Sequence, residues 1–274
     1  MSVINTNIKS LISQNALARN GRDVQHAMEQ LSTGKRINSA ADDAAGLAIS
    51  NKMTSQIRGL DQAVRNANDG ISLLQTAEGA TYEITNMLQR MRELAVQSAN
   101  DTYSDNDRAA LNKEMEQLEA EITRIAGNTK WNNMPILSSD SITKNLQVGI
   151  ANDDESTIAI AFEDLTAAGL EVGGLDVLTH ANSQSALDKL DAAISQVDSF
   201  RADLGAKINR LNYAADNLSN ISTNTSASRS RIQDADYAKA SSELARTQII
   251  QQAATAILAQ ANTDQQSVLK LLQG

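Results

Sequence analysis

The chain has 274 residues, a formal net charge of −9, one proline, no cysteine and only 3% aromatic residues. The absence of cysteine excludes disulfides, cysteine-ligated zinc and thiol nucleophiles. The negative balance disfavours non-specific binding to nucleic acid, which needs clustered cations. The scarcity of proline and aromatic residues favours long helices over an ordinary globular enzyme fold.

The charge is unevenly distributed along the chain. Residues 138–200 hold eleven acidic and two basic side chains, and this stretch therefore carries a net charge equal to that of the whole chain. Residues 1–60 carry a net charge of +3. We therefore expect the middle of the chain to face water.

Apolar residues recur at alternating spacings of three and four in five stretches, which is the pattern of helices that wrap around one another. The first stretch contains Leu17, Val24, Met28 and Leu31. The second runs from Ile57 to Ser98 without a proline. At about 1.5 Å per residue, a helix over 47–98 would be roughly 80 Å long.

Three further helices are expected after a turn at 99–103. Ser104, followed three residues later by Asp107, resembles a helix N-cap, and Gly127 and Asn128 mark the end of that helix. The fourth helix has a regular apolar seam over 187–218 that only Arg201 interrupts. The fifth lies near the C-terminus, over 250–271.

Between the third and fourth helices the apolar period changes to two. Residues 146–150 and 157–162 alternate in this way and are separated by a polar stretch, which predicts a β-hairpin. A short strand is expected over 134–137 and a loop over 169–174. The predicted fold is thus mainly α, with a small β-hairpin region.

No group of residues carries a convincing catalytic, metal or phosphate signature. His26 and His180 lie far apart, and neither belongs to a zinc-binding motif. Residues 33–36 resemble the end of a phosphate-binding loop, but Glu29 stands where its first glycine is required, so they more plausibly end a helix. The acids at 42–43 and 153–155 are typical of caps and loops. We expect no enzyme activity, no cofactor and no metal.

Neither an ordinary signal peptide nor a membrane span is expected. The first seven residues lack both a basic region and an apolar run. Residues 247–263 carry no charge but include five glutamine and asparagine side chains, which disfavours insertion into a membrane. A chain of this kind that leaves the cell would use another route.

The two end helices have few large aliphatic side chains for the number of residues that must be ordered. We therefore expect both ends to be loose in the monomer and to become ordered against other chains. A monomeric helical bundle is the alternative. The residues expected to be buried on self-assembly are Leu17, Val24, Leu31, Ile250, Ile257, Leu258, Val268 and Leu271.

Four blocks of sequence closely resemble bacterial flagellins. Two are N-terminal, at 31–49 (LSTGKRINSAADDAAGLAI) and 88–100 (LQRMRELAVQSAN). Two are C-terminal, at 228–237 (SRSRIQDADY) and 252–262 (QAATAILAQAN). They are long, specific and in the family's order, and the resemblance covers roughly 1–140 and 176–274.

The resemblance implies a long antiparallel helical coiled-coil rod that self-assembles into the extracellular flagellar filament. Residues 1–44 and 235–274 would form the inner-core helical domain. Residues 45–175 would supply rod helices, the β-hairpin and a short outward segment, and 176–234 the C-terminal rod helix. Only about 40 residues stand where longer flagellins insert outer domains.

The resemblance also implies partners. These are other copies of the chain, the flagellar type III export apparatus, a flagellin chaperone, and the filament cap and junction proteins. Arg90, Leu94 and Glu114 align with positions that Toll-like receptor 5 recognises in some flagellins. The alternative is that Arg90 and Leu94 chiefly pack against neighbouring subunits.

Three other functions compete with a filament subunit. A hook–filament junction protein shares the terminal helices, but the block at 234–237 favours flagellin. A chemoreceptor-like signalling coiled coil is disfavoured by the predicted hairpin and the missing membrane spans. An enzyme in the outward region would have too short a stretch, without histidine pairs, in which to build a site.

Overall fold

The computed structural model describes residues 6–138 and 143–273, with side chains described as far as residue 263. Contacts divide the chain into two compact units, one formed by 1–57 with 224–274 and the other by 58–223. The helices are α1 (Ile8–Thr33), α2 (Ala44–Ser98), α3 (Asp105–Asn128), α4 (His180–Gln233) and α5 (Tyr237–Gln273). The strands are β1 (Lys130–Trp131), β2 (Met134–Pro135), β3 (Thr143–Gln147) and β4 (Thr157–Ala161), with a 3₁₀ turn at Asp154–Ser156.

This architecture confirms the predicted mainly α fold with a small β-hairpin. The turn after α2 is present, and α3 begins with a capping box in which Ser104 and Asp107 satisfy each other's backbone amides. Helix α4 is longer than its predicted apolar seam over 187–218: it begins at His180 and ends at Gln233.

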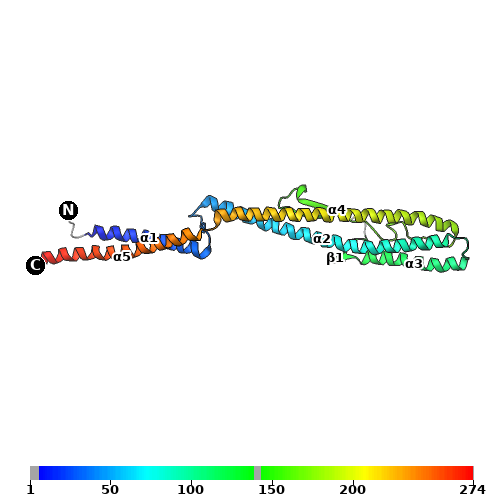
Figure 1. The fold of residues 1–274 in the computed structure, drawn as a ribbon, viewed down its shortest axis with the longest axis horizontal. Coiled ribbons are helices and arrows are strands. Elements are labelled where there is room, and N and C mark those ends of the chain that lie inside the picture. Colours follow the sequence, from blue (N-terminus) through cyan, green and yellow to red (C-terminus); the bar gives the residue numbers. More distant parts are fainter. Residues whose placement is uncertain (1–5, 139–142, 274) are drawn as a thin grey trace. The chain divides into compact units, whose positions relative to one another are not determined.

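In the second unit, α2 and α4 lie antiparallel (Figure 1), and the apolar seam between them forms two buried clusters. Two polar contacts show the register: Ser222 donates to Asp61 at 2.8 Å, and Arg92 Nε lies 2.6 Å from Asp191 Oδ1. Every step forward along α2 between these contacts is matched by an equal step back along α4. Large aliphatic side chains at the seam positions are buried, as the three- and four-residue spacing predicted.

Arg201 interrupts this seam, as expected, and the structure shows how the helix pair accommodates it. Its guanidinium carbon lies 5.8 Å from the centre of the Tyr82 ring on α2, which is a cation–π contact. Its Nη1 lies 3.9 Å from Asp198 one turn earlier, while its Nε is buried without a hydrogen-bond partner among the described residues. The interruption therefore sits at the edge of the seam rather than in its centre.

The β-hairpin is confirmed, but its first strand begins earlier than predicted. Strand β3 starts at Thr143 and pairs antiparallel with β4 so that Leu146 lies opposite Ile158. The pattern missed residues 143–145 because they are polar, although their backbone pairs regularly. The hairpin approaches α2 closely at Gly70, where a Cβ would lie 2.2 Å from Leu146 Cδ1.

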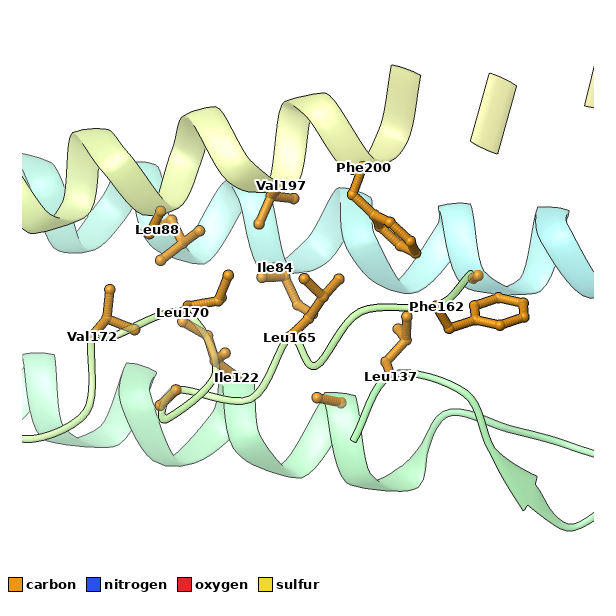
Figure 2. Close-up of a cluster of buried hydrophobic side chains, with 14 of the residues drawn as sticks. Ile84, Leu88, Ile122, Leu137, Phe162, Leu165, Leu170, Val172, Val197 and Phe200 are labelled. Carbon is orange, nitrogen blue, oxygen red and sulfur yellow. The ribbon is translucent and has the colours of Figure 1, made fainter. Parts of the chain in front are cut away.

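The segment between β4 and α4 is buried, which differs from the expectation that the middle of the chain faces water. Residues 162–177, the buried strap, pass between α3 and the α2–α4 pair (Figure 2). Leu165 and Val172 are fully buried, whereas Glu163 and Glu171 are exposed. The acids point outward and the apolar side chains between them complete the core. A segment with a negative net charge can therefore still run through the interior.

Polar side chains of α3 and one backbone carbonyl satisfy the irregular backbone of the strap. Asn112 Oδ1 accepts a bond from the Val177 amide at 3.0 Å, and Glu119 Oε1 accepts one from Gly174 at 3.0 Å. The Leu165 amide donates to the Leu137 carbonyl at 2.9 Å. A strap without secondary structure can be buried only because these groups replace the water that it loses.

We expect Leu165→Ala to lower the free energy of unfolding of the second unit by about 2–5 kcal/mol, because it leaves a cavity between three helices. Chemical denaturation followed by circular dichroism measures this change. Leu178→Ala is the matched control, since Leu178 is 44% exposed and follows the strap directly. Equal effects of the two substitutions would contradict a core role for the strap.

Candidate functional site

The connection between α1 and α2 folds against the start of α5. Gly34 ends α1 in the left-handed conformation at φ 70°, which a glycine adopts without strain. Its carbonyl accepts a hydrogen bond from Ala235 at 2.9 Å, and Arg36 donates to the Gln233 carbonyl at 2.7 Å. The glycine–lysine pair therefore ends a helix, as predicted, and belongs to no phosphate-binding loop.

The acids at 42–43 hold this connection in shape. Asp42 accepts hydrogen bonds from the amides of Asn38 and Ser39, each at 2.9 Å, and Asp43 accepts one from Gly46 at 2.8 Å. The backbone bond from Ser39 is the largest cause that lowers the pKa of Asp42, followed by the bond from Asn38. These carboxylates are thus engaged as caps.

The two end helices, α1 and α5, lie side by side (Figure 1). The buried side chains at their contact are small or polar, and large aliphatic side chains are at most half-buried there. Among the residues whose side chains are described, the buried ones of the two helices are Ser10, Asn20, Ala27, Ala240, Thr247 and Ala261. Residues of this size let the two backbones approach closely but bury little apolar surface.

Two asparagines connect α1 to the backbone of α5. Asn20 is 6% exposed and its Nδ2 donates to the Thr247 carbonyl at 2.8 Å. Asn7 caps the start of α1 and donates in the same way to the Ala261 carbonyl at 2.9 Å. Because both bonds end on main-chain atoms at defined positions, they determine the antiparallel register of the pair.

Six large aliphatic side chains of the end helices are exposed outside this contact. Their exposed fractions are 55% for Ile8, 51% for Leu11, 65% for Ile12, 66% for Ile249, 40% for Ile250 and 59% for Ile257. Isolated exposed apolar residues are common, but so many on one helix pair indicate a surface that other protein covers. We call these six residues the outer aliphatic surface.

The predicted self-assembly residues fall into three groups. Ile250 and Ile257 belong to the outer aliphatic surface. Leu17, Val24, Leu31 and Leu258 are half-buried. Val268 and Leu271 lie outside the residues whose side chains are described.

One member of the first apolar stretch was misplaced. Met28 was expected in the seam of α1 but is 55% exposed, whereas Ala27 beside it is 2% exposed. Because α5 approaches α1 closely, the small side chain of Ala27 fits at the contact and that of Met28 does not. Asn7 and Asn20 were also missed, although Asn20 stands four residues before Val24 and seven before Ala27, a spacing that places it on the same helix face.

Two shallow grooves run beside the α1–α5 contact and share Ile12. One, of about 360 Å³, is lined by Lys9, Ile12, Ser13, Ile257, Gln260 and Ala261. The other, of about 500 Å³, is lined by Ile12, Asn15, Ala16, Arg19, Asn20, Asp23, Arg246 and Ile250. Both are open and partly aliphatic, which suits contact with another helix better than enclosure of a small substrate.

The remaining candidate groups give no reactive site. His26 Nδ1 lies 3.6 Å from Asp42 Oδ1, and His180 is exposed at the first position of α4. Within the described part of the chain, no cluster of three potential metal ligands occurs. No helix in that part is both long and apolar enough to cross a membrane.

The residues aligned with receptor recognition do not all share one surface. Arg90 is exposed, and its guanidinium contacts Glu114 of α3 and Glu93, each at 2.9 Å. Hydrogen bonding to Glu114 is the largest cause that raises the pKa of Arg90. Leu94, however, is only 1% exposed and belongs to the core. Within the single subunit its side chain packs into the core of the second unit, whereas Arg90 lies at the surface.

Comparison with known families gives two matches that together cover most of the chain. The bacterial flagellin N-terminal helical region matches residues 4–141. The bacterial flagellin C-terminal helical region matches residues 187–272. Between them lie the β3–β4 hairpin, the strap and the beginning of α4.

Curated relatives match over the full length. A flagellin of Halalkalibacterium halodurans is 48% identical over 271 residues, covering 99% of this chain and 100% of the relative. The flagellar filament 33 kDa core protein of Treponema phagedenis is 43% identical over 286 residues, covering 99% of this chain and 100% of the relative.

Among solved structures, one described as a flagellar hook-associated protein from Vibrio parahaemolyticus is similar in fold. Its TM-score is 0.59 at 15% identity, covering 70% of this chain and 100% of that one. At this identity it supports the fold alone, whereas the two family matches and the full-length relatives establish the family. The chain therefore belongs to the bacterial flagellins and is a structural subunit of the flagellar filament.

Proposed function

We propose that the outer aliphatic surface of α1 and α5 is the surface by which one subunit binds the next in the filament. The observation that supports this proposal is that the helix pair buries small side chains and exposes large aliphatic ones, the reverse of an ordinary core. Small side chains lie between the two helices, while Ile12, Ile249 and Ile257, each at least 59% exposed, lie outside. Covering each of these side chains would contribute roughly 1.5–3 kcal/mol.

Polymerisation of this kind needs no catalyst. A patch on one subunit that fits a different patch on an identical subunit gives a head-to-tail contact, and when the rotation does not close, the product is an open helix of unlimited length. The grooves beside the α1–α5 contact, lined in part by Ile12, Ile250 and Ile257, supply concave surface. The exposed side chains of Ile8, Leu11 and Ile249 lie outside these linings and supply the other surface. Both halves of such a contact are thus present on one helix pair.

Entry into the filament also orders the end helices. The contact between α1 and α5 buries mainly alanine, serine, threonine and asparagine, which return little free energy against the entropy of ordering. Two asparagine hydrogen bonds contribute about 0.5–1.5 kcal/mol each. The ends are accordingly loose in the free subunit and become rigid when neighbours cover their aliphatic side chains.

The same chain suits export in an unfolded state. It has no cysteine to cross-link it and 3% aromatic residues, so few side chains are bulky. Export through the flagellar type III apparatus, a chaperone on α5, and contacts with the cap and junction proteins follow from family membership. The destination is the extracellular filament.

Recognition by Toll-like receptor 5 is a separate proposal. It rests on the exposed ion pairs of Arg90 with Glu93 and Glu114, which present a guanidinium between two helices of the second unit. Leu94 supports the position of α2 from within the core and makes no direct contact.

We expect Ile257→Asp to leave the purified subunit soluble and its second unit folded, but to prevent polymerisation. A carboxylate would replace an aliphatic side chain that neighbours must desolvate. Electron microscopy and sedimentation of concentrated protein measure the outcome. Ile257→Val, which keeps the apolar character, and Gln252→Asp, which adds the same charge at a polar position of α5, are the controls. Normal filaments from Ile257→Asp would rule out this surface.

We expect the amides of α1 and α5 to exchange with solvent rapidly in the monomer and to be protected in the polymer. Amide hydrogen exchange with mass spectrometry measures both states. Amides of α2 and α4 within 58–223 provide the internal control, because their core is complete in one subunit. Strong protection of both ends in isolated monomer would refute ordering on assembly.

For receptor recognition, we expect Arg90→Ala to reduce the response of reporter cells that carry Toll-like receptor 5. Arg124→Ala is the matched control, because Arg124 forms a similar exposed pair with Glu121 on α3. An inactive wild-type monomer, or equal activity of the two variants, would reject the proposal.

A further inference from the structure

Asn20 is followed by Gly21, and this is the single Asn–Gly sequence in the chain. In flexible peptides, an asparagine before glycine loses its side-chain amide faster than other asparagines. The reason is steric, because glycine has no Cβ to hinder attack by its own backbone nitrogen. The residue that fixes the register of α1 against α5 is therefore also the asparagine with the most reactive sequence.

The structure places this sequence where the reaction is blocked. Asn20 and Gly21 lie inside α1, whose hydrogen-bond ladder engages the Gly21 amide and holds the backbone away from the geometry of attack. The side-chain amide of Asn20 is itself occupied, since Nδ2 donates to the Thr247 carbonyl at 2.8 Å and the residue is 6% exposed. Protection lasts only while α1 is helical and paired with α5.

We propose that Asn20 is a deamidation site that stays intact in the paired helices and reacts when α1 is unpaired. The Gly21 backbone nitrogen, having lost its proton to water or hydroxide, forms a bond to Asn20 Cγ. The bond from Cγ to Nδ2 breaks and ammonia leaves, giving a cyclic imide. Addition of one water opens the ring to aspartate or isoaspartate, so the sum is asparagine plus water giving aspartate or isoaspartate plus ammonia.

The product cannot rebuild the contact with α5. Aspartate at position 20 presents a carboxylate, which has no hydrogen to donate, to the Thr247 carbonyl oxygen in a buried position. Two acceptors then face each other, and the loss of the donor removes one of the two bonds that determine the register. Isoaspartate adds a methylene to the backbone, which also interrupts the ladder of α1.

This inference rests on the proposed function at one step only. Subunits that wait unassembled, with loose ends, would lose the amide, whereas subunits in the filament would keep it. Deamidated subunits would then fail to add to a filament. The chemistry at Asn20 and its effect on assembly are measured separately, so that either can fail alone.

The chemical test incubates full-length protein as filament, as monomer, and as chain unfolded in urea, at mildly alkaline pH. Peptide mapping by mass spectrometry measures aspartate and isoaspartate at position 20. We expect loss to be fastest in the unfolded chain, intermediate in the monomer and slowest in the filament. Gly21→Ala is the control, because a Cβ there meets no atom within 4 Å and so fits the fold. It should slow the reaction of the unfolded chain by about tenfold or more.

The functional test compares Asn20→Asp with Gln25→Glu. Gln25 is exposed on α1 and lines neither groove, so Gln25→Glu also converts an amide to a carboxylate but does not remove the buried bond. We expect Asn20→Asp to raise the protein concentration needed for polymerisation by about tenfold or more, and Gln25→Glu to leave it nearly unchanged.

Equal rates of Asn20 deamidation in the filament and in the unfolded chain would contradict protection by the paired helices. Slow deamidation of Asn20 in the unfolded chain would show that the site is not reactive. Equal polymerisation of Asn20→Asp and wild type would overturn the effect on assembly. If wild-type protein forms no filaments, the proposed function fails, while the difference between monomer and unfolded chain still decides the chemistry at Asn20.

Discussion

The terminal unit depends on how closely α1 and α5 approach each other. Close approach requires small side chains between the helices, and Ala27, Ala240 and Ala261 meet that requirement. The consequence is that large aliphatic side chains lie at the margin of the contact, half-buried, or outside it, where the subunit itself does not cover them. On the proposal that neighbouring subunits cover the outer aliphatic surface, the helix pair gains specificity from its own contact and hydrophobic stabilisation from its neighbours.

The second unit follows the opposite design. Its seam carries leucine, isoleucine and methionine at the contact positions, and the buried strap fills the space between α3 and the α2–α4 pair. Buried polar groups such as Asn112 and Ser98 satisfy the strap's backbone, so the core is complete within one chain. One polypeptide combines this complete core with a terminal unit that, in the proposal above, is completed by assembly.

The sequence predicted well wherever large apolar residues repeat regularly. The seams of α2, α3 and α4, the Ser104 cap and the hairpin were found because each has a period or a local motif. The strap was missed because Leu165, Leu170 and Val172 follow no period and stand among acids. The seam of α1 was placed partly wrongly because hydrophobicity points to Met28, whereas the distance between helix backbones selects Ala27.

The buried asparagines show why hydrophobicity alone is an incomplete guide to this family of contacts. A seam of alanines is nearly featureless and would tolerate several registers, since sliding by one turn replaces one small side chain by another. The hydrogen bonds from Asn7 and Asn20 to single carbonyls of α5 restrict that freedom, because a slip breaks both bonds and must bring new carbonyls to both amides at once. The register in turn decides which isoleucines share the outer aliphatic surface. Two polar side chains therefore determine the shape of an apolar surface that they do not themselves form.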